Sequence, residues 1–127
     1  MALVTRWHVE NRIVLSALIG NISIEELMAE SRIIAPMVTN GKAPVHVIVD
    51  TTKMGRSPTN LMQVKDTVPY LKYPNMGVMV IIGGNNPLVR FMSTAIGQLL
   101  GVRLRVTGSL DEAEALLRQL DATLAAQ

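Results

Sequence analysis

The sequence predicts an α/β fold in which an N-terminal β-hairpin is followed by four βα units, giving a mixed, mostly parallel sheet with flanking helices. The pattern has a period of two, as in a half-buried hairpin, with Leu3, Thr5, Trp7 and Val9 in the first strand and Ile13, Leu15, Ala17 and Ile19 in the second. Two apolar runs, residues 45–49 and 76–82, suit strands that are buried on both faces. Each of the later strands precedes a stretch with helix-start signals, so we expect right-handed crossovers and parallel strands after the hairpin.

The first helix has a clear start. The hairpin is expected to end at Gly20, and Ser23 with Glu26 matches a capping box, in which each side chain bonds a free amide of the first turn. Apolar residues at helical spacing follow. Pro36 is expected to bend or end this helix.

The second βα unit contains the most informative stretch. The strand over residues 45–49 is expected to stop at Asp50 and to lead into a loop. Ser57 and Pro58 form a strong start signal, because proline is favoured at the first helical position and serine just before it. They predict a helix over residues 58–71.

The last two units repeat this logic. Asn86 and Pro87 are expected to begin the third helix and Gly101 to close it. The strand over residues 102–106 alternates with arginine, which indicates one solvated face near a sheet edge. A second capping box, starting at Ser109, begins the final helix.

Length and composition limit the classes of function. A chain of 127 residues is expected to form one domain, residues 1–127. Only 17% of residues are charged, against about 25% in typical proteins, which favours a covered surface such as a homodimer interface. The formal charge is +2 and the basic residues form no run, which argues against nucleic-acid binding.

The residues and motifs that the sequence lacks indicate its compartment and argue against a cofactor. It has no cysteine, which is typical of proteins in a reducing cytosol. Its longest apolar run, residues 76–82, is far shorter than the roughly 20 residues that a membrane span needs, and its first residues lack the apolar core of a signal peptide. No spacing predicts a metal cluster or a nucleotide-binding glycine loop. We expect a cytoplasmic protein without a cofactor, a metal or a membrane span.

The residues that catalysis would need are not evidently brought together. His46 lies in a strand predicted to be buried and His8 on the polar face of the hairpin, so neither is paired with Ser57 or Asp50. The acids Glu25, Glu26, Asp111, Glu112 and Glu114 are explained by helix starts. We therefore expect a non-catalytic protein; a catalytic domain using Asp50 and the turn at residues 85–86 is the minor alternative.

Polar residues that recognise a partner are expected where strands end and helices begin. In parallel sheets these ends share one edge, so residues 50–60 and 83–87 should meet along a common rim. Asp50 either caps its own loop or holds a ligand, and the turn before Pro87 is either an anion-binding nest of amides or simply a tight turn. The predicted partner or ligand surface comprises Asp50, Thr51, Thr52, Met54, Arg56, Ser57, Thr59, Asn60, Gly84, Asn85 and Asn86.

The element order resembles the STAS domain, the fold shared by anti-anti-sigma factors and the cytoplasmic tails of sulfate transporters. The resemblance covers nearly the whole chain, and the chain is more similar still to stand-alone bacterial proteins described as STAS-like or SEC14-like. It implies a regulatory module whose partner is a kinase or another signalling protein. The residues that carry it are Trp7 and residues 13–20 in the hairpin, residues 47–50, and Met76-Gly77-Val78 with Gly83-Gly84-Asn85.

The resemblance also implies candidate phosphorylation sites. In phosphorylated STAS regulators an Asp-Ser-Ser-Gly or Asp-Ser-Ala-Gly stretch opens the second helix, and a partner kinase modifies its serine. The corresponding stretch here, Ser57-Pro58-Thr59-Asn60, keeps two hydroxyls but lacks the Asp-Ser pair and the glycine. A phosphate on Ser57 or Thr59 would sit where a helix start favours negative charge; the alternative is that Ser57 only caps its helix.

Two function classes follow. The leading hypothesis is a non-catalytic regulatory or protein-interaction module that presents the loop and helix start after Asp50, gated by phosphorylation at Ser57 or Thr59. The alternative is a carrier of a small hydrophobic ligand or lipid, with an apolar pocket at the same rim lined by Met54, Met62, Met92 and Phe91.

Overall fold

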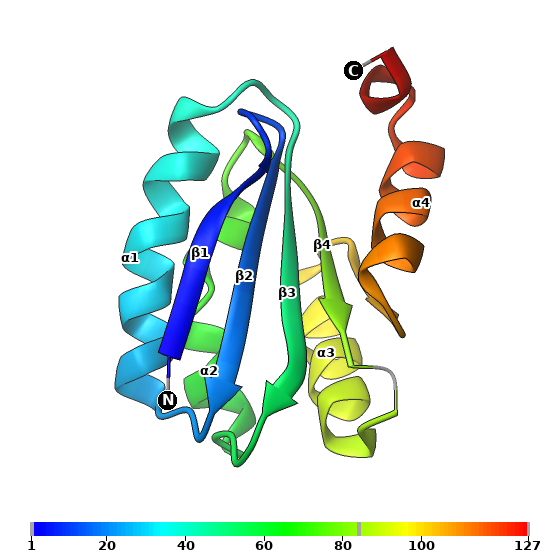
Figure 1. The fold of residues 1–127 in the computed structure, drawn as a ribbon. Helices are drawn as coiled ribbons and strands as arrows, with labels where there is room; N and C mark the ends of the chain where they lie inside the picture. Colours follow the sequence, from blue (N-terminus) through cyan, green and yellow to red (C-terminus); the bar gives the residue numbers. More distant parts are fainter. Residues whose placement is uncertain (1, 84, 127) are drawn as a thin grey trace.

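The computed structural model describes residues 2–83 and 85–126, which form a five-stranded sheet flanked by helices (Figure 1). The strand order is β1-β2-β3-β4-β5. β1 and β2 are antiparallel, and each later strand is parallel to its neighbour, so the predicted fold class is confirmed. The strands are β1 (Ala2–Val9), β2 (Ile13–Gly20), β3 (Val45–Met54), β4 (Met76–Ile82) and β5 (Leu104–Thr107).

Helices cover both faces of the sheet. Three helices lie on one face, and α4 with the short 3-10 helix η2 lies on the other. Among the described residues, no helix is both long and apolar enough to cross a bilayer. The helices are α1 (Ile24–Asn40), α2 (Leu61–Asp66), the 3-10 helix η1 (Pro69–Lys72), α3 (Pro87–Leu100), α4 (Leu110–Leu120) and η2 (Ala122–Ala126).

The alternation of side chains along each strand creates two cores. In β3, Val47 and Val49 belong to the core beneath α1 and α3, whereas Ile48 belongs to the core beneath α4. Because both faces are covered, residues 45–49 of β3, apart from His46, and residues 78–82 of β4 are buried and apolar on both sides.

Most predicted helix boundaries are confirmed. Ser23 and Glu26 form the reciprocal capping box, and Asn86 caps α3. Ser109 caps α4, but the predicted capping box is incomplete there, because the Glu112 carboxylate accepts from the N–H of Gly108. Gly101 ends α3 in the left-handed conformation, with φ of 64°.

Pro36, which we expected to bend or end the first helix, does not end it. α1 continues through it to Asn40. Pro36 is on the exposed side of the helix, while Ile34 and Val38 on either side of it are fully buried against the sheet. The burial of those two side chains holds the helix together across the missing backbone donor.

β3 is longer than predicted. The chain does not turn into a loop after Asp50, because β3 remains paired with β2 as far as the pair Met54 with Gly20. The irregular segment begins at Gly55, whose N–H donates to the carbonyl of Gly20 (2.8 Å). Because its backbone pairs with β2, the strand includes residues 51–54, although they are polar or partly exposed.

The second helix is much shorter than the predicted 58–71. α2 begins at Leu61, and its cap is Asn60, whose Oδ1 accepts from the Gln63 N–H (3.0 Å). Ser57 therefore does not cap it, and Pro58 is not its first residue. The helix ends before Val68 because that residue precedes Pro69, and a residue before proline is excluded from the helical conformation.

Candidate functional site

The two predicted turns lie side by side at the carboxyl ends of β3 and β4. Thr51 Oγ1 donates to the carbonyl oxygen of Ile82 (2.7 Å), and a Cβ on Gly83 would collide with that hydroxyl. A surface depression joins the two turns, and we call its border the rim. The rim is lined by Thr51, Thr52, Met54, Gly83, Asn85, Asn86, Pro87 and Gly108.

Asp50, inside β3, forms two local hydrogen bonds with Thr52. Its Oδ1 accepts from the N–H (2.9 Å) and from the hydroxyl (2.7 Å) of Thr52. Of the two roles considered for Asp50, the local cap is the one whose hydrogen bonds the structure shows.

The irregular segment at residues 55–60 is anchored by its backbone. The Arg56 N–H donates to Asn21 Oδ1 (2.8 Å) and the Arg56 carbonyl accepts from the Ile22 N–H (2.8 Å). The side chain of Arg56 and that of Thr59 are exposed, whereas Ser57 is half-buried. The backbone is thus held while exposed side chains face outward.

The asparagine turn is used to start α3. Asn86 Oδ1 accepts from the N–H groups of Leu88 (2.9 Å) and Val89 (3.3 Å), and Asn85 is exposed. Gly84, which we placed in the candidate surface, lies outside the described residues. The anion-binding nest stays a prediction.

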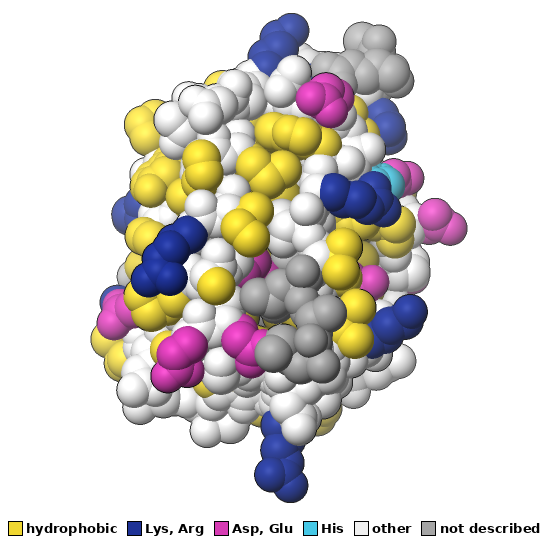
Figure 2. Space-filling model, turned by 60° about the vertical axis from the view of Figure 1, so that its left-hand side comes forward, with side chains coloured by type: hydrophobic (Ala, Val, Ile, Leu, Met, Phe, Trp, Pro, Cys, Tyr) yellow, Lys and Arg dark blue, Asp and Glu magenta, His cyan; other side chains and the backbone are white. Residues whose placement is uncertain are grey.

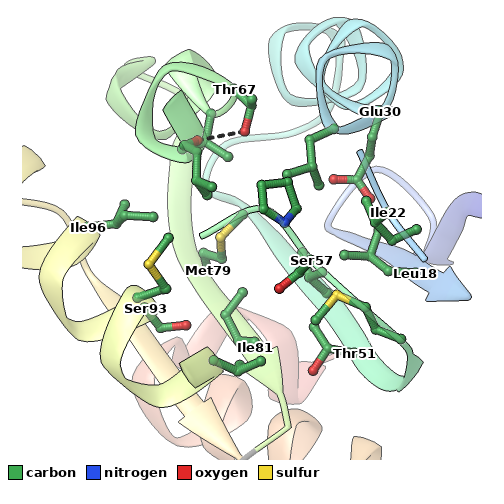
Figure 3. A pocket seen from close by; sticks show the side chains of 18 of the residues that line it. Leu18, Ile22, Glu30, Thr51, Ser57, Thr67, Met79, Ile81, Ser93 and Ile96 are labelled. Atoms are coloured by element: carbon green, nitrogen blue, oxygen red, sulfur yellow. Dashed lines mark hydrogen bonds between the residues drawn. The ribbon is translucent and has the colours of Figure 1, made fainter. Parts of the chain in front are cut away.

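A cavity of about 120 Å³ lies beneath the rim, between the sheet and α1 to α3 (Figure 3). Its walls are mostly apolar and include Met54 and Met92, two of the four residues in the predicted pocket. Met62 and Phe91 are 55% and 63% exposed and do not line it. Phe91 faces away because the inward stripe of α3 runs through Val89, Met92 and Ile96.

Glu30 and Tyr70 are among the cavity residues that were not predicted from the sequence. Glu30 in α1 is 4% exposed, and its Oε2 accepts from the Ser16 hydroxyl. Burial raises the pKa of the Glu30 carboxyl above its ordinary 4.5, and the Ser16 hydrogen bond opposes that shift. One signal was available: Glu30 lies three residues after Leu27 and four before Ile34, on the apolar face of its helix.

Tyr70 comes from η1 and is 1% exposed. Its hydroxyl is buried and has no hydrogen-bond partner among the described residues. Burial, and then the nearby charge of Glu30, raises the pKa of the Tyr70 hydroxyl well above 10. The hydroxyl is therefore a neutral donor in an apolar wall.

Glu30→Gln is expected to change how stability depends on pH. Because the pKa of Glu30 is higher in the folded state than in the unfolded state, protonated Glu30 favours the folded state. Its contribution to the free energy of unfolding is therefore complete below pH 4.5 and is lost as the pH rises through the folded-state pKa. The variant should lose less stability than the wild type as the pH is raised from 4.5, as measured by urea midpoints. The control is Glu25→Gln, at an exposed position of the same helix, and its stability should follow the wild-type pH curve. A pH curve of Glu30→Gln that coincides with that of the wild type would contradict the expectation.

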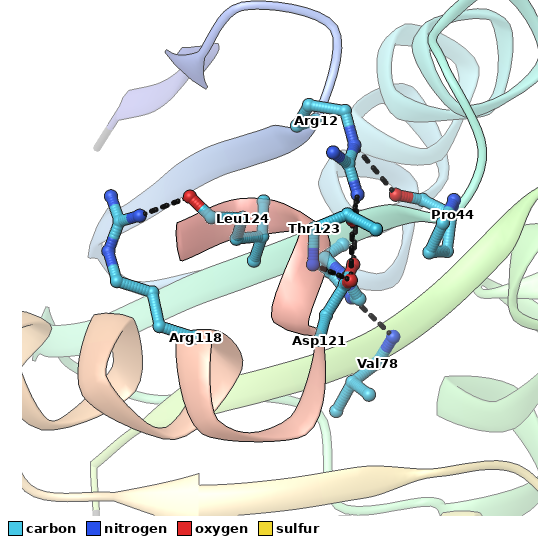
Figure 4. A network of polar contacts seen from close by, with 8 residues as sticks. Arg12, Pro44, Val78, Arg118, Asp121, Thr123 and Leu124 are labelled. Atoms are coloured by element: carbon cyan, nitrogen blue, oxygen red, sulfur yellow. Dashed lines mark hydrogen bonds and ion pairs between the residues drawn. The ribbon is translucent and has the colours of Figure 1, made fainter. Parts of the chain in front are cut away.

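A second buried polar cluster lies at the opposite end of the strands (Figure 4). Asp121 Oδ2 accepts from Arg12 Nη2 (2.9 Å) and from His46 Nε2 (2.8 Å). Asp121 Oδ1 accepts from the N–H of Thr123 (3.0 Å), and Arg12 also bonds the Pro44 carbonyl (3.3 Å). The cluster fastens the segment after α4 to the starts of β2 and β3.

The ionisation of this cluster follows from its hydrogen bonds. His46 Nδ1 accepts from the Val78 N–H (2.9 Å), so the ring proton is on Nε2 and is donated to Asp121. Burial lowers the pKa of His46, which is neutral. Burial acts to raise the pKa of Asp121, but hydrogen bonds from Thr123 and His46 outweigh it and lower that pKa from 3.8 to about 2.

Neither histidine is available at the rim. Both ring nitrogens of His46 are occupied, at the far end of β3, and His8 contacts Glu114 on α4. A general base needs a ring nitrogen free to take a proton from the reacting group. The described part of the chain therefore assembles no Ser–His–Asp arrangement around Ser57 or Asp50.

Comparisons with known proteins concern the fold. No family model matches the sequence, and no curated protein is significantly similar to it. The structure of the anti-sigma factor antagonist SpoIIAA in its unphosphorylated form is 14% identical, with a TM-score of 0.67 over 92% of this chain and 98% of that chain. The phosphorylated form of SpoIIAA, a Bacillus cell fate determinant, is 15% identical, with a TM-score of 0.61 over 92% and 100%. An uncharacterised DUF3478-family protein with a SpoIIAA-like fold, from Shewanella loihica, is 11% identical, with a TM-score of 0.65 over 91% and 92%.

Proposed function

We propose that this chain, a STAS-like domain with the fold of SpoIIAA, is a non-catalytic regulatory module that binds a protein partner through the rim and residues 55–60. The observation that carries the proposal is that two separate turns expose polar side chains along one edge while their backbones are anchored. A pre-organised surface loses little conformational freedom on binding. SpoIIAA, which shares this fold, is described as an anti-sigma factor antagonist.

The proposed partner is a kinase or another signalling protein in the cytoplasm. A second copy of this chain is a further proposed partner, because apolar side chains remain exposed on the face that α1 and the hairpin present (Figure 2). Met28 and Ile33 of α1 and Val4 of β1 are 42%, 48% and 48% exposed. Sedimentation velocity at several protein concentrations measures this self-association, and a constant monomer mass would contradict it.

Charge reversal in the anchored segment, residues 55–60, is expected to weaken partner binding. Arg56 is exposed in the anchored segment, so Arg56→Glu changes the proposed surface without removing a buried contact. We expect about a tenfold weaker complex with a signalling protein encoded beside this chain, measured by isothermal titration calorimetry. The matched control is Lys42→Glu, an equally exposed reversal between α1 and β3, at the opposite end of the strands. Equal affinity of the two variants and the wild type would remove residues 55–60 from the proposed surface.

We extend the proposal to phosphorylation at Ser57 or Thr59. Thr59 is exposed and Ser57 is half-buried against the cavity, which makes Thr59 the more accessible acceptor. A phosphate there would add close to two negative charges to the proposed surface. Intact mass after incubation with a partner kinase should show one phosphate, which Thr59→Ala removes and Ser57→Ala keeps. No mass gain, together with unchanged binding by both variants, would contradict this gating.

A second candidate function is the carriage of a small hydrophobic ligand. The apolar cavity beneath the rim favours it. Native mass spectrometry of protein purified without detergent should then show a retained apolar ligand, and a spectrum with only the mass of the bare chain would count against a carrier.

A further inference from the structure

The inner wall of the cavity contains a polar pair that its apolar lining does not explain. Glu30 and Tyr70 both line the cavity, and both are at least nine-tenths buried. The Tyr70 hydroxyl lacks a hydrogen-bond partner among the residues described. A buried, unbonded polar group costs about 1 to 3 kcal/mol, so a tyrosine is a poor filler where phenylalanine would serve.

The surroundings of Glu30 orient it as an acceptor. The Thr5 and Ser16 hydroxyls are 3.0 Å apart, and Ser16 donates to Glu30 Oε2. Figure 3 shows the Glu30 side chain extending from α1 toward the cavity. A carboxyl group has acceptor sites in both of its protonation states, so Glu30 retains acceptor capacity beyond the bond from Ser16.

The size of the cavity limits what enters it. Its volume of about 120 Å³ is close to the roughly 150 Å³ of an engineered protein cavity that binds benzene. A lipid chain or a nucleotide is larger than this space, whereas one substituted ring matches it. Thr51 and Met54 line both the cavity and the surface depression at the rim, which gives a route from solvent.

We propose that the cavity binds a neutral, single-ring molecule with one hydroxyl group, which accepts a hydrogen bond from Tyr70 and donates one to Glu30. A hydroxyl has one proton and two lone pairs, which complements one phenol donor and one carboxylate acceptor. The ring replaces water against the apolar wall formed by Met79, Ile81 and Ile96. This inference rests on the second candidate function and names its ligand class.

The test compares phenol with toluene, which has the same shape but no hydroxyl. Dissociation constants are measured by titration calorimetry on the wild type, on Tyr70→Phe and on Tyr73→Phe. The preference for phenol over toluene should fall about three- to tenfold in Tyr70→Phe, as expected for one lost hydrogen bond. Tyr73→Phe, which removes a hydroxyl from a residue outside the cavity lining, should keep the wild-type preference.

The possible outcomes separate this inference from the carrier function. If both probes bind and Tyr70→Phe leaves their ratio unchanged, the polar recognition is wrong and the apolar carrier stands. If neither probe binds the wild type, both are wrong. Tyr70→Phe removes only an unbonded hydroxyl and should fold, which its thermal midpoint verifies.

Discussion

Asp121→Ala is expected to lower the free energy of unfolding by about 4 kcal/mol, as breaking a buried ion pair typically costs about 3 to 5 kcal/mol. The variant leaves the Arg12 guanidinium, which is 2% exposed, without its carboxylate. It also removes the acceptor of the His46 Nε2–H, on a ring that is fully buried. Urea unfolding followed by circular dichroism measures the loss.

The matched control is Asp66→Ala. Asp66 pairs with Lys65 at 2.9 Å, the same distance as Asp121 and Arg12, but the Asp66 side chain is 71% exposed. An exposed pair contributes at most about 1 kcal/mol. Similar losses in the two variants would show that burial of the Asp121 cluster does not govern its energy.

Protonation of the Asp121 carboxylate is expected to lower the stability of the protein in acid. Because the pKa of Asp121 is depressed in the folded state, its contribution is present above pH 3.8 and is lost as the pH falls through about 2. The neutral, buried His46 adds to the loss below pH 6.5, since the unfolded chain takes up that proton first. The stability difference between the wild type and Asp121→Ala should therefore shrink as the pH approaches 2.

Gly77→Ala is expected to destabilise the protein by about 3 kcal/mol, through overpacking and a weakened buried hydrogen bond. A Cβ at this position would collide with the imidazole of His46. That ring cannot move aside cheaply, because one nitrogen accepts from the Val78 N–H and the other donates to Asp121. The loss is measured by chemical unfolding at pH 7.

Gly97→Ala is the control, with the same substitution and the opposite expected sign. Gly97 lies inside α3, where an added Cβ would meet Leu104 at 3.5 Å, an ordinary contact. Replacing glycine by alanine within a helix stabilises by up to about 1 kcal/mol. A neutral Gly77→Ala would show that the His46 ring is not held where its two hydrogen bonds place it.

Local sequence patterns predicted most of the fold because their causes are local. The periodicity of the hairpin, the caps Ser23 and Ser109 and the asparagine before Pro87 each act within a few residues, and the structure has a strand or a helix start at each of these places. The predicted bounds of the second helix were wrong, and the reason is also local. Pro69 lies inside the predicted 58–71 helix, and it excludes Val68 from the helical conformation.

The candidate site was only partly predictable. The meeting of residues 51–54 with Gly83 and the turn before α3 followed from parallel strand order, since the carboxyl ends of such strands share one edge. The extension of β3 to Met54 did not follow, because its polar residues are held by the backbone of β2 rather than by their own side chains. Met62 and Phe91 were misplaced because short apolar motifs do not show which helix face is turned inward.

By itself, the sequence determined the order of strands and helices, the two-sided burial of the central strands and the edge at which the exposed polar turns lie. These depend on periodicity and capping, which neighbouring residues specify. Only the tertiary structure decided that Glu30 and Tyr70 share a cavity and that Arg12, His46 and Asp121 form one cluster. Those groups are separated by as much as 109 positions along the chain. Their burial, which sets their pKa values and their energetic weight, arises only when the helices close over the sheet.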